Sequence, residues 1–193
     1  TIYHGDCREI LAKLEFDAIV TDPPYGLGEL WRGGNSGGWA ACRYDEIKEW
    51  DGSTVDVVSS FPGLAVPTVI WGGNYYDLPP ARCWFLWDKK QGDSWTTAQA
   101  EMAWTNLERP VRMFRMSQVE AYGTMNKEHP TQKPIALMSW CLEMMRLDAA
   151  AVIADPFMGS GTTLRVAKDR GGKAIGIELD ERYCEIAAKR MGQ

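Results

Sequence analysis

The stretch Asp155-Pro-Phe-Met-Gly-Ser-Gly-Thr-Thr163 decides the fold of this chain. The apolar residues 151–154 before it are typical of a buried strand, and residues 164–170 after it have a helical pattern. A second strand pattern, residues 174–178, follows closely and ends on the acid Glu178. Strand, glycine turn, helix, strand and acid together predict a nucleoside-binding βαβ unit, here placed near the C-terminus.

The glycine turn favours a cofactor without a diphosphate. Gly159 and Gly161 are present, but Leu164 occupies the place of the third glycine of the dinucleotide fingerprint, which disfavours a nicotinamide oxidoreductase. Two glycines with small neighbours still allow a ligand to lie against backbone amides at the start of a helix. Glu178, at a strand end, can accept both hydroxyls of a ribose. This combination predicts S-adenosyl-L-methionine as the cofactor.

Length and composition indicate one globular domain. The chain has 193 residues, of which 45% are hydrophobic, enough for one ordinary core. Its five cysteines are scattered without a CxxC pair and it has only two histidines, so we expect neither a disulfide framework nor a metal site. No signal-peptide pattern and no membrane-spanning apolar run is present, so we expect a cytoplasmic protein.

The charge is unevenly distributed. The net charge of −5 disfavours a nonspecific binder of polyanions. Residues 82–133, however, carry eight basic and six acidic side chains, a local net charge of +2. A solvated surface explains such a small excess as well as a nucleic-acid contact does.

Strand and helix patterns fill most of the remaining chain. Strands are expected at residues 1–4, 16–21, 68–71 and 83–87, and the runs 100–106 and 111–116 predict a hairpin at the sheet edge. Helices are expected at residues 8–14, capped by Asp6, and at 54–61, 135–146 and 181–191. Residues 117–134 have no regular pattern. The glycine- and tryptophan-rich residues 26–52 predict a loop that orders over a flat ligand or, alternatively, an ordinary surface loop. We therefore predict a single α/β domain.

A second motif, Asp22-Pro-Pro-Tyr25, directly follows the expected strand 16–21. Its prolines end the strand and fix an acid and an aromatic residue at the edge where open α/β sheets bind ligands. These groups suit an amine-methylation site. Asp22 and the Pro23 carbonyl would accept hydrogen bonds from an exocyclic amino group, and Tyr25 would stack on the heterocycle. A general acid/base role for Asp22 and a simple turn are the alternatives.

Five motifs occur in the order Gly5-Asp-Cys7, Thr21-Asp-Pro-Pro-Tyr25, His129-Pro-Thr-Gln-Lys-Pro134, Asp155 to Thr163, and Gly176-Ile-Glu-Leu-Asp180. With them the chain resembles the DNA amino-methyltransferases of the permuted β group, most of all the adenine-specific type and its compact phage and prophage forms. In that group the catalytic half precedes the cofactor half. The resemblance thus implies one domain, residues 1–193, with a catalytic half 1–128 and a cofactor half 129–193.

The resemblance also implies a fold and a set of site residues. The fold would be the Rossmann-like methyltransferase fold, a mostly parallel seven-stranded sheet with one antiparallel strand. Asp22, Pro23, Pro24 and Tyr25 would be catalytic. The S-adenosylmethionine site would contain Asp6 and Cys7 at the adenine, Thr131 and Lys133 at the methionine end, Asp155, Phe157, Gly159, Ser160, Gly161, Thr162 and Thr163 along the methionine, and Glu178, Leu179 and Asp180 near the ribose.

The chain departs from larger members of this group, because only 41 residues separate Trp87 from His129 and no separate target-recognition domain fits there. DNA contacts would have to come from the loop 26–52, the expected hairpin, residues 117–128 or a second subunit, and a homodimer is a possible arrangement. The candidate phosphate or base contacts are Arg32, Arg43, Lys89, Lys90, Arg112 and Arg115.

Methyl transfer from S-adenosylmethionine to the N6 amino group of adenine in DNA is the leading hypothesis. The target nucleotide would be flipped out of the duplex, because a stacked base cannot reach such a pocket. Serine usually replaces Asp22 in the cytosine-amino enzymes of the group, but methylation of the cytosine N4 amino group stays open. A non-catalytic DNA-binding partner subunit is the alternative outside the enzyme class.

Overall fold

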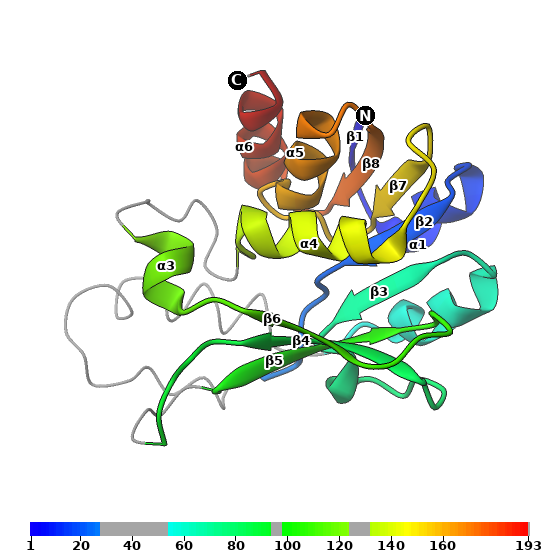
Figure 1. Cartoon of the computed structure of the whole chain (residues 1–193). Coiled ribbons are helices and arrows are strands. Elements are labelled where there is room, and N and C mark those ends of the chain that lie inside the picture. The colour runs from blue at the N-terminus through cyan, green and yellow to red at the C-terminus, as the bar shows by residue number, and fades with distance from the viewer. Residues whose placement is uncertain (28–53, 94–97, 124–131, 193) are drawn as a thin grey trace.

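The computed structural model describes residues 1–27, 54–93, 98–123 and 132–192 (Figure 1). Their strands form one sheet in the order β1-β8-β7-β2-β3-β5-β4-β6. The strands are β1 Ile2–His4, β2 Ala18–Thr21, β3 Thr68–Trp71, β4 Cys83–Asp88, β5 Ala100–Thr105, β6 Arg112–Arg115, β7 Val152–Asp155 and β8 Lys173–Glu178. Among these strands only β5 runs antiparallel to its neighbours. The predicted α/β class with a mostly parallel sheet is confirmed.

Helices cover both faces of the sheet. The α-helices are α1 Cys7–Ile10, α3 Gln118–Tyr122, α4 Ile135–Met145, α5 Thr162–Asp169 and α6 Glu181–Gly192, and the 3-10 helices are η1 Leu11–Lys13, η4 Asp56–Leu64 and η5 Gly73–Tyr75. Figure 1 shows α4, α5 and α6 side by side on one side of the sheet. No described helix is long and apolar enough to cross a membrane.

The core consists of two apolar layers because neighbouring residues of a strand point to opposite faces. Val69 and Trp71 of β3 pack in the layer with α4 and α5, whereas Ile70 packs with α1 and η4 in the other layer. Every residue of β2 and β3 is buried. Central parallel strands covered on both faces are apolar almost throughout, which is the pattern of their sequences.

The sheet has eight strands rather than the seven that the family resemblance implied. The additional pairing is at the edge, where β1 lies parallel to β8 and Tyr3 stands opposite Ile177. The patterns in the sequence itself mark eight strand-like runs, and all eight enter the sheet. The resemblance therefore undercounted the strands, and the local patterns gave the correct number.

The predicted hairpin of residues 100–106 and 111–116 is wrong. Strand β5 lies between β3 and β4 and is antiparallel to both, with Trp104 opposite Ile70 and Trp84. Both edges of β5 are therefore occupied, so β6 pairs instead with the far edge of β4, parallel to it. The hairpin is formed by β4 and β5, which are joined through residues 89–99.

Helix α3 lies in the stretch 117–134 that was expected to be irregular. Ser117 accepts a hydrogen bond from the backbone N–H of Glu120, and the Glu120 carboxylate accepts one from the backbone of Ser117. This reciprocal capping box fixes the first turn of a helix. The Ser-x-x-Glu signal was present in the sequence, but no apolar periodicity accompanied it.

Candidate active site

Three acids meet at one edge of the sheet. Strands β2, β7 and β8 are parallel, with β7 between the other two. Their carboxyl ends therefore lie together, and they carry Asp22 just after β2, Asp155 at the end of β7 and Glu178 at the end of β8. Open α/β sheets bind their ligands at this edge. The two motifs that are far apart in the sequence thus belong to one site.

The Asp22–Tyr25 turn is fixed by aromatic residues that follow β3. The Tyr25 hydroxyl donates a hydrogen bond to Asp22 Oδ1 at 2.7 Å, and the Tyr76 hydroxyl donates one to the Pro24 carbonyl. The Tyr25 ring stacks on Tyr75, with centroids 5.1 Å apart and planes 22° apart. Gly72, at φ +66°, allows this approach, because a Cβ there would lie 2.0 Å from the Tyr25 ring. The ring expected to stack on a substrate therefore already has a protein ring on one face.

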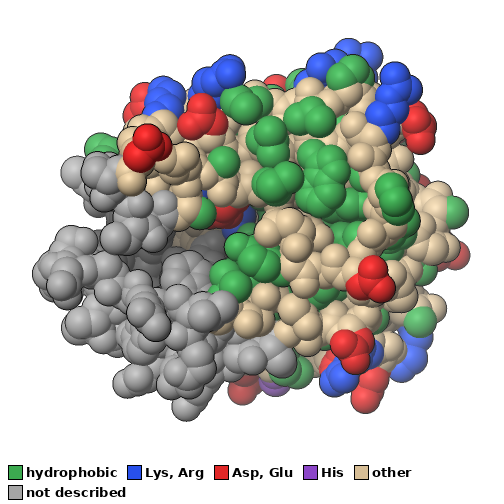
Figure 2. Space-filling model, turned by 90° about the horizontal axis from the view of Figure 1, so that it is seen from below, with side chains coloured by type: hydrophobic (Ala, Val, Ile, Leu, Met, Phe, Trp, Pro, Cys, Tyr) green, Lys and Arg blue, Asp and Glu red, His purple; other side chains and the backbone are tan. Residues whose placement is uncertain are grey.

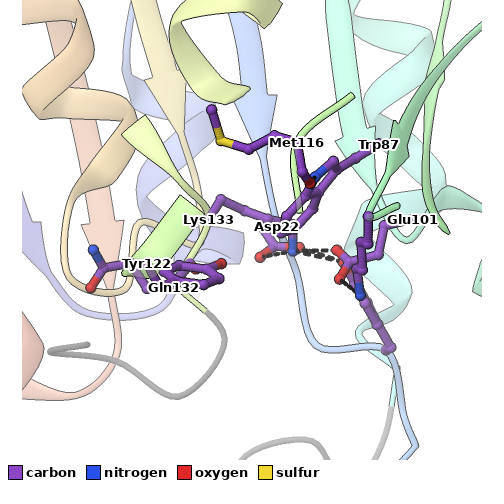
Figure 3. Close-up of polar contacts among 9 residues, drawn as sticks. Asp22, Trp87, Glu101, Met116, Tyr122, Gln132 and Lys133 are labelled. Atoms are coloured by element: carbon purple, nitrogen blue, oxygen red, sulfur yellow. Dashed lines mark hydrogen bonds and ion pairs between the residues drawn. The ribbon is translucent and has the colours of Figure 1, made fainter. Parts of the chain in front are cut away.

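A chain of alternating charges begins at Asp22 (Figure 3). Lys133 Nζ lies 2.6 Å from Asp22 Oδ2 and 3.1 Å from Glu101 Oε2. Lys89 Nζ lies 2.7 Å from Glu101 Oε1. Both lysine side chains are only 6% exposed. Figure 2 shows acidic and basic side chains at the bottom of a hollow in this face of the molecule. Two positive and two negative groups thus compensate one another in a site shielded from water.

The protonation of this cluster follows from its charges. Burial works against the ionised form of Glu101, but Lys133 and Lys89 lower the pKa of Glu101 to about 2. Burial also disfavours a charged Lys133, but Asp22 and Glu101 raise the pKa of that ammonium well above its usual value. Burial raises the pKa of Asp22, and Lys133 opposes this shift. Lys133 is therefore an ammonium whose charge favours the ionised form of Asp22.

Asp155 is a buried carboxylate at the start of the glycine loop. It accepts hydrogen bonds from Thr21 Oγ1 at 2.9 Å and from the backbone N–H of Phe157 at 3.2 Å. Burial raises the pKa of Asp155 to about 7, although these hydrogen bonds oppose the shift. Such a group is ready to accept a positively charged partner, whose approach would restore its ionised form.

This raised pKa gives a testable pH dependence. Between the ordinary value and about pH 7 the folded protein holds a proton on Asp155 that the unfolded chain releases, so stability falls as the pH rises through this window. The Asp155→Asn protein has no titrating group at this position, so its stability lacks this pH dependence. The free energy of unfolding of the wild-type protein, measured with urea and without cofactor, is expected to fall between pH 5 and pH 8 by roughly 1–3 kcal/mol relative to Asp155→Asn. Equal changes in both proteins would show that Asp155 is not the titrating group.

Glu178 fixes the glycine loop from the neighbouring strand. Its Oε2 accepts a hydrogen bond from the backbone N–H of Gly159 at 3.0 Å, and its Oε1 accepts one from Asp180 at 2.9 Å. Burial raises the pKa of Glu178. The next residue, Leu179, is 71% exposed, while the Asp180 side chain accepts from the backbone of Arg182 at the start of α6. Glu178 therefore has a loop-holding role beside the predicted ribose contact.

Ser160 in the same loop is held by α6. Arg190 Nη1 donates to the Ser160 carbonyl oxygen at 2.7 Å and to Ser160 Oγ at 2.8 Å, and the guanidinium is buried. Sequence reasoning missed Arg190, because it appears there as one of several charges on an amphipathic helix. In the sequence, Arg190 could have been recognised only by its spacing, because it shares one face of α6 with the buried Cys184 and Ala187.

Gly161 is required for two reasons, which gives a second prediction. Its φ is +77°, and a Cβ at this position would lie 2.9 Å from the Cβ of Ala187 in α6. Gly161→Ala is therefore expected to lower the free energy of unfolding by about 2–3 kcal/mol. Gly63→Ala is the matched control, because a Cβ there meets nothing within 4 Å, and we expect it to change stability little. Chemical denaturation measures both, and equal effects of the two substitutions would contradict this role of Gly161.

One pocket joins the two motifs. Its lining comes from the Asp22 turn, from the segment that leads into α4, from α4 itself, from the glycine loop and from the start of α5. It consists of Asp22, Gln132, Lys133, Met138, Asp155, Phe157, Met158, Gly159, Ser160, Thr162 and Thr163. Asp6 and Cys7 lie outside this lining but close to the same edge, since Gly5 donates its backbone N–H to the Glu178 carbonyl. Asp6 caps α1, and burial raises the pKa of the Cys7 thiol to about 11. Thr131 lies outside the described residues.

The candidate DNA contacts differ in their exposure to solvent and in their ion pairs. Lys89, a predicted phosphate or base contact, is 5% exposed and pairs with Glu101. Lys90 pairs with Glu120 at 3.0 Å and Arg115 with Asp88 at 3.5 Å, both near the surface. Arg112 is exposed on β6. Arg32 and Arg43, with most of the loop 26–52, lie outside the described residues.

Sequence reasoning did not foresee Glu101 as a site residue or the contacts that Lys133 makes with Asp22 and Glu101. Lys133 was predicted to lie over the methionine end of the cofactor, and it does line the pocket, but its ammonium contacts Asp22 and Glu101. Glu101 was read only as a charge in an edge strand. Within the described part of the chain no group of three or more His, Cys, Asp or Glu side chains is suited to a metal ion.

Comparison with known proteins agrees with this geometry. Residues 68–189 match a family model described as DNA methylase, of the N6/N4 type. The chain is 24% identical to the Type II methyltransferase M.ScaI of Streptomyces caespitosus, over 98% of this chain and 80% of that protein. The M1.HpyAVI–SAM complex superimposes with a TM-score of 0.62 at 22% identity, over 100% and 99% of the two chains. PvuII DNA methyltransferase, described as cytosine-N4-specific, gives 0.65 at 19% identity, over 98% and 85%.

Proposed function

Because the chain belongs to the N6/N4 family of DNA methylases, we propose that it transfers a methyl group from S-adenosyl-L-methionine to the exocyclic N6 amino group of adenine in DNA. The observation that carries this proposal is the shared pocket. Asp22, followed by two prolines and a tyrosine, lines the same space as Asp155 and the glycine loop. An amine acceptor thus faces a nucleoside-type cofactor site across one sheet edge.

The chemistry assigned to Asp22 is orientation and charge stabilisation. An amino group that donates a hydrogen bond to this carboxylate, and a second one to the Pro23 carbonyl, would direct its nitrogen lone pair away from them, toward the cofactor pocket. S-adenosylmethionine supplies an electrophilic methyl group when it is bound there. The nitrogen that accepts this methyl group would become positive as the methyl carbon leaves the donor sulfur, and the negative charge of Asp22 would stabilise it. The nitrogen then loses its extra proton to water.

The cofactor half would bind the donor mainly through the glycine loop. Asp155 would receive the positively charged part of the methionine, and Phe157 through Thr163 would lie along it. Glu178 would hold the ribose with the oxygen lone pairs that Gly159 and Asp180 do not use. The exposed Leu179, with Asp6 and Cys7 beside it, would contact the adenine ring. In this division residues 1–128 present the substrate amine and residues 129–193 bind the donor.

The DNA partner must present its base outside the helix, because the pocket that Asp22 lines is too narrow for a duplex. The exposed described candidates for phosphate contacts are Lys90 and, on β6, Arg112 and Arg115. A homodimer would double this basic surface. A site-specific modification enzyme of a bacterial or phage-infected cell is the role that fits this chemistry.

Cytosine N4 is the second candidate substrate. The structural similarity to the PvuII enzyme favours it, although at 19% identity this similarity concerns the fold. Asp22 favours adenine, since the cytosine-amino enzymes that the chain resembles usually carry serine there. The test is to incubate the protein with DNA and labelled cofactor, digest the DNA to nucleosides and identify the methylated base by mass spectrometry. N6-methyl-2′-deoxyadenosine supports the proposal, and N4-methyl-2′-deoxycytidine contradicts it in favour of the second candidate.

A non-catalytic DNA-binding subunit is a third candidate. The same experiment addresses it, because such a protein would bind DNA in a gel-shift assay and leave every methyl group on the cofactor.

A further inference from the structure

An amine of the protein occupies the position that the proposed function gives to the amine of the substrate. Lys133 Nζ donates hydrogen bonds to Asp22 Oδ2 at 2.6 Å and to the Tyr25 hydroxyl oxygen at 3.0 Å (Figure 3). Lys133 also lines the pocket that contains Asp155 and Gly159. The acceptor expected to bind an exocyclic amino group is therefore already bound to an amine of the chain itself.

This arrangement is incompatible with methyl transfer. The target nitrogen becomes positive as it accepts the methyl group, and an ammonium on the same carboxylate oxygen would oppose that charge in a buried, weakly screened site. The other Asp22 oxygen, Oδ1, already accepts the Tyr25 hydroxyl. Lys133 must therefore leave Asp22 before the substrate amine can bind productively.

Glu101 provides the place to which Lys133 can move. Its buried Oε2 already forms an ion pair with Lys133 Nζ at 3.1 Å, but the two groups are not aligned as a hydrogen bond. Its other oxygen is held by Lys89, which lies over the Trp87 ring at 5.2 Å from the centroid. A small rotation of the Lys133 side chain would complete a hydrogen bond to a carboxylate that is already in place. The ammonium would stay buried and paired throughout.

We propose that Lys133 holds the position of the target amine until DNA arrives, and that Glu101 is a positioning residue that receives the ammonium when the base enters. The proposal rests on the proposed function, because Asp22 is the acceptor of the substrate amine in both. The two carboxylates also explain why Lys133 is not itself methylated. They raise the pKa of its ammonium well above the usual value, against the effect of burial, so its nitrogen has no lone pair to offer.

The test compares Glu101→Gln, Lys133→Met and the double variant. In Glu101→Gln the ammonium has Asp22 as its only carboxylate, so kcat for DNA methylation is expected to fall by at least about tenfold, with the Kd for S-adenosylhomocysteine within about threefold of wild type. Adding Lys133→Met removes the competitor of the substrate. We expect it to raise kcat by at least about fivefold over Glu101→Gln at the alkaline end of the pH range, because burial raises the pKa of Asp22 and the variant lacks the cation that opposes this shift.

A merely structural role of Glu101 predicts something else. It would lower the Tm and the cofactor affinity together with kcat, and the second substitution would give no relief. A double variant as slow as Glu101→Gln at every pH from about 6 to 9.5 would overturn the proposal and make Lys133 a participant in the transfer. Glu120→Gln is the matched control, because Glu120 also pairs with a lysine, Lys90 at 3.0 Å, but on the surface. We expect its rate to be that of the wild type.

A second variant tests the proposal if the Glu101→Gln protein does not fold. Lys89→Met/Glu101→Gln removes one charge of each sign, keeps the cluster neutral and leaves Lys133 with Asp22 alone. The same loss of kcat, and the same relief by Lys133→Met, is expected. If the wild-type protein methylates neither adenine nor cytosine, the proposed function fails and this inference fails with it. Wild-type turnover with no relief in the double variant overturns this inference alone.

Discussion

Replacement of Asp22 by alanine is expected to lower the rate of methyl transfer by roughly 10³-fold, while the Kd for S-adenosylhomocysteine changes by less than about threefold. The rate falls because the variant can neither orient the substrate amine nor stabilise the positive charge that develops on it. The affinity is retained because the contacts that hold the glycine loop come from Glu178 and Arg190 and do not involve Asp22. Single-turnover methylation and isothermal titration calorimetry measure the two quantities.

Two further substitutions make this experiment decisive. Asp22→Asn keeps the size and one acceptor oxygen but loses the charge, so its rate should lie between those of the wild type and Asp22→Ala. Asp77→Ala removes an exposed carboxylate that follows the nearby Tyr75–Tyr76 pair and should change nothing. A loss of cofactor affinity in Asp22→Ala as large as its loss of rate would place Asp22 in the cofactor site rather than at the substrate.

Replacement of Glu178 by alanine should mainly weaken cofactor binding and leave kcat at saturating cofactor nearly unchanged, the reverse of the effect of Asp22→Ala. The variant loses two hydrogen bonds from the backbone N–H groups of Gly159 and Asp180 to a buried carboxylate, together with the proposed ribose contact. Hydrogen bonds to a charged group contribute about 1.5–3 kcal/mol, so we expect the Kd for S-adenosylhomocysteine to rise by roughly 10- to 100-fold. At saturating cofactor kcat should recover to near the wild-type value.

The control for this variant is Glu181→Ala, which removes an exposed acid three residues further along the chain. It should leave cofactor affinity unchanged. A Glu178→Ala protein that binds cofactor as tightly as the wild type would show that Glu178 does not hold the ribose and that the glycine loop keeps its conformation without it.

Local patterns in the sequence predicted the strands better than they predicted strand pairing. Each of the eight strand-like runs is recognisable because β-branched and aromatic residues cluster there. The pairing of the strands does not follow from these patterns, because β5 could pair with the strand that precedes it or with the strand that follows it. What decides is whether a strand edge is free, and the β3–β5 contact that closes one edge joins residues far apart in the sequence. No local pattern reports such a contact.

The site was predictable where a motif fixes the backbone and not where side chains meet across elements. The turn after β2 and the glycine loop after β7 follow from prolines and glycines at defined positions. The cluster of Lys89, Glu101 and Lys133 comes from three separate segments, and nothing in the sequence indicates that these three charges meet. Because both lysines are buried and the Glu101 side chain is only 22% exposed, each charge needs a partner of opposite sign, and this condition becomes visible only in three dimensions.

The position of β2 in the sheet has a consequence for synthesis of the protein. Strand β2 lies between β3 and β7, and β1 pairs with β8, so the two earliest strands each require a partner from residues 152–178. At elongation rates of roughly 5–20 residues per second, β2 waits on the order of ten seconds for β7 to be made. During this time the Asp22 turn has no facing loop. A nascent chain therefore has no active centre, and an unpaired apolar strand edge is exposed to chaperones until the last third of the described chain has left the ribosome.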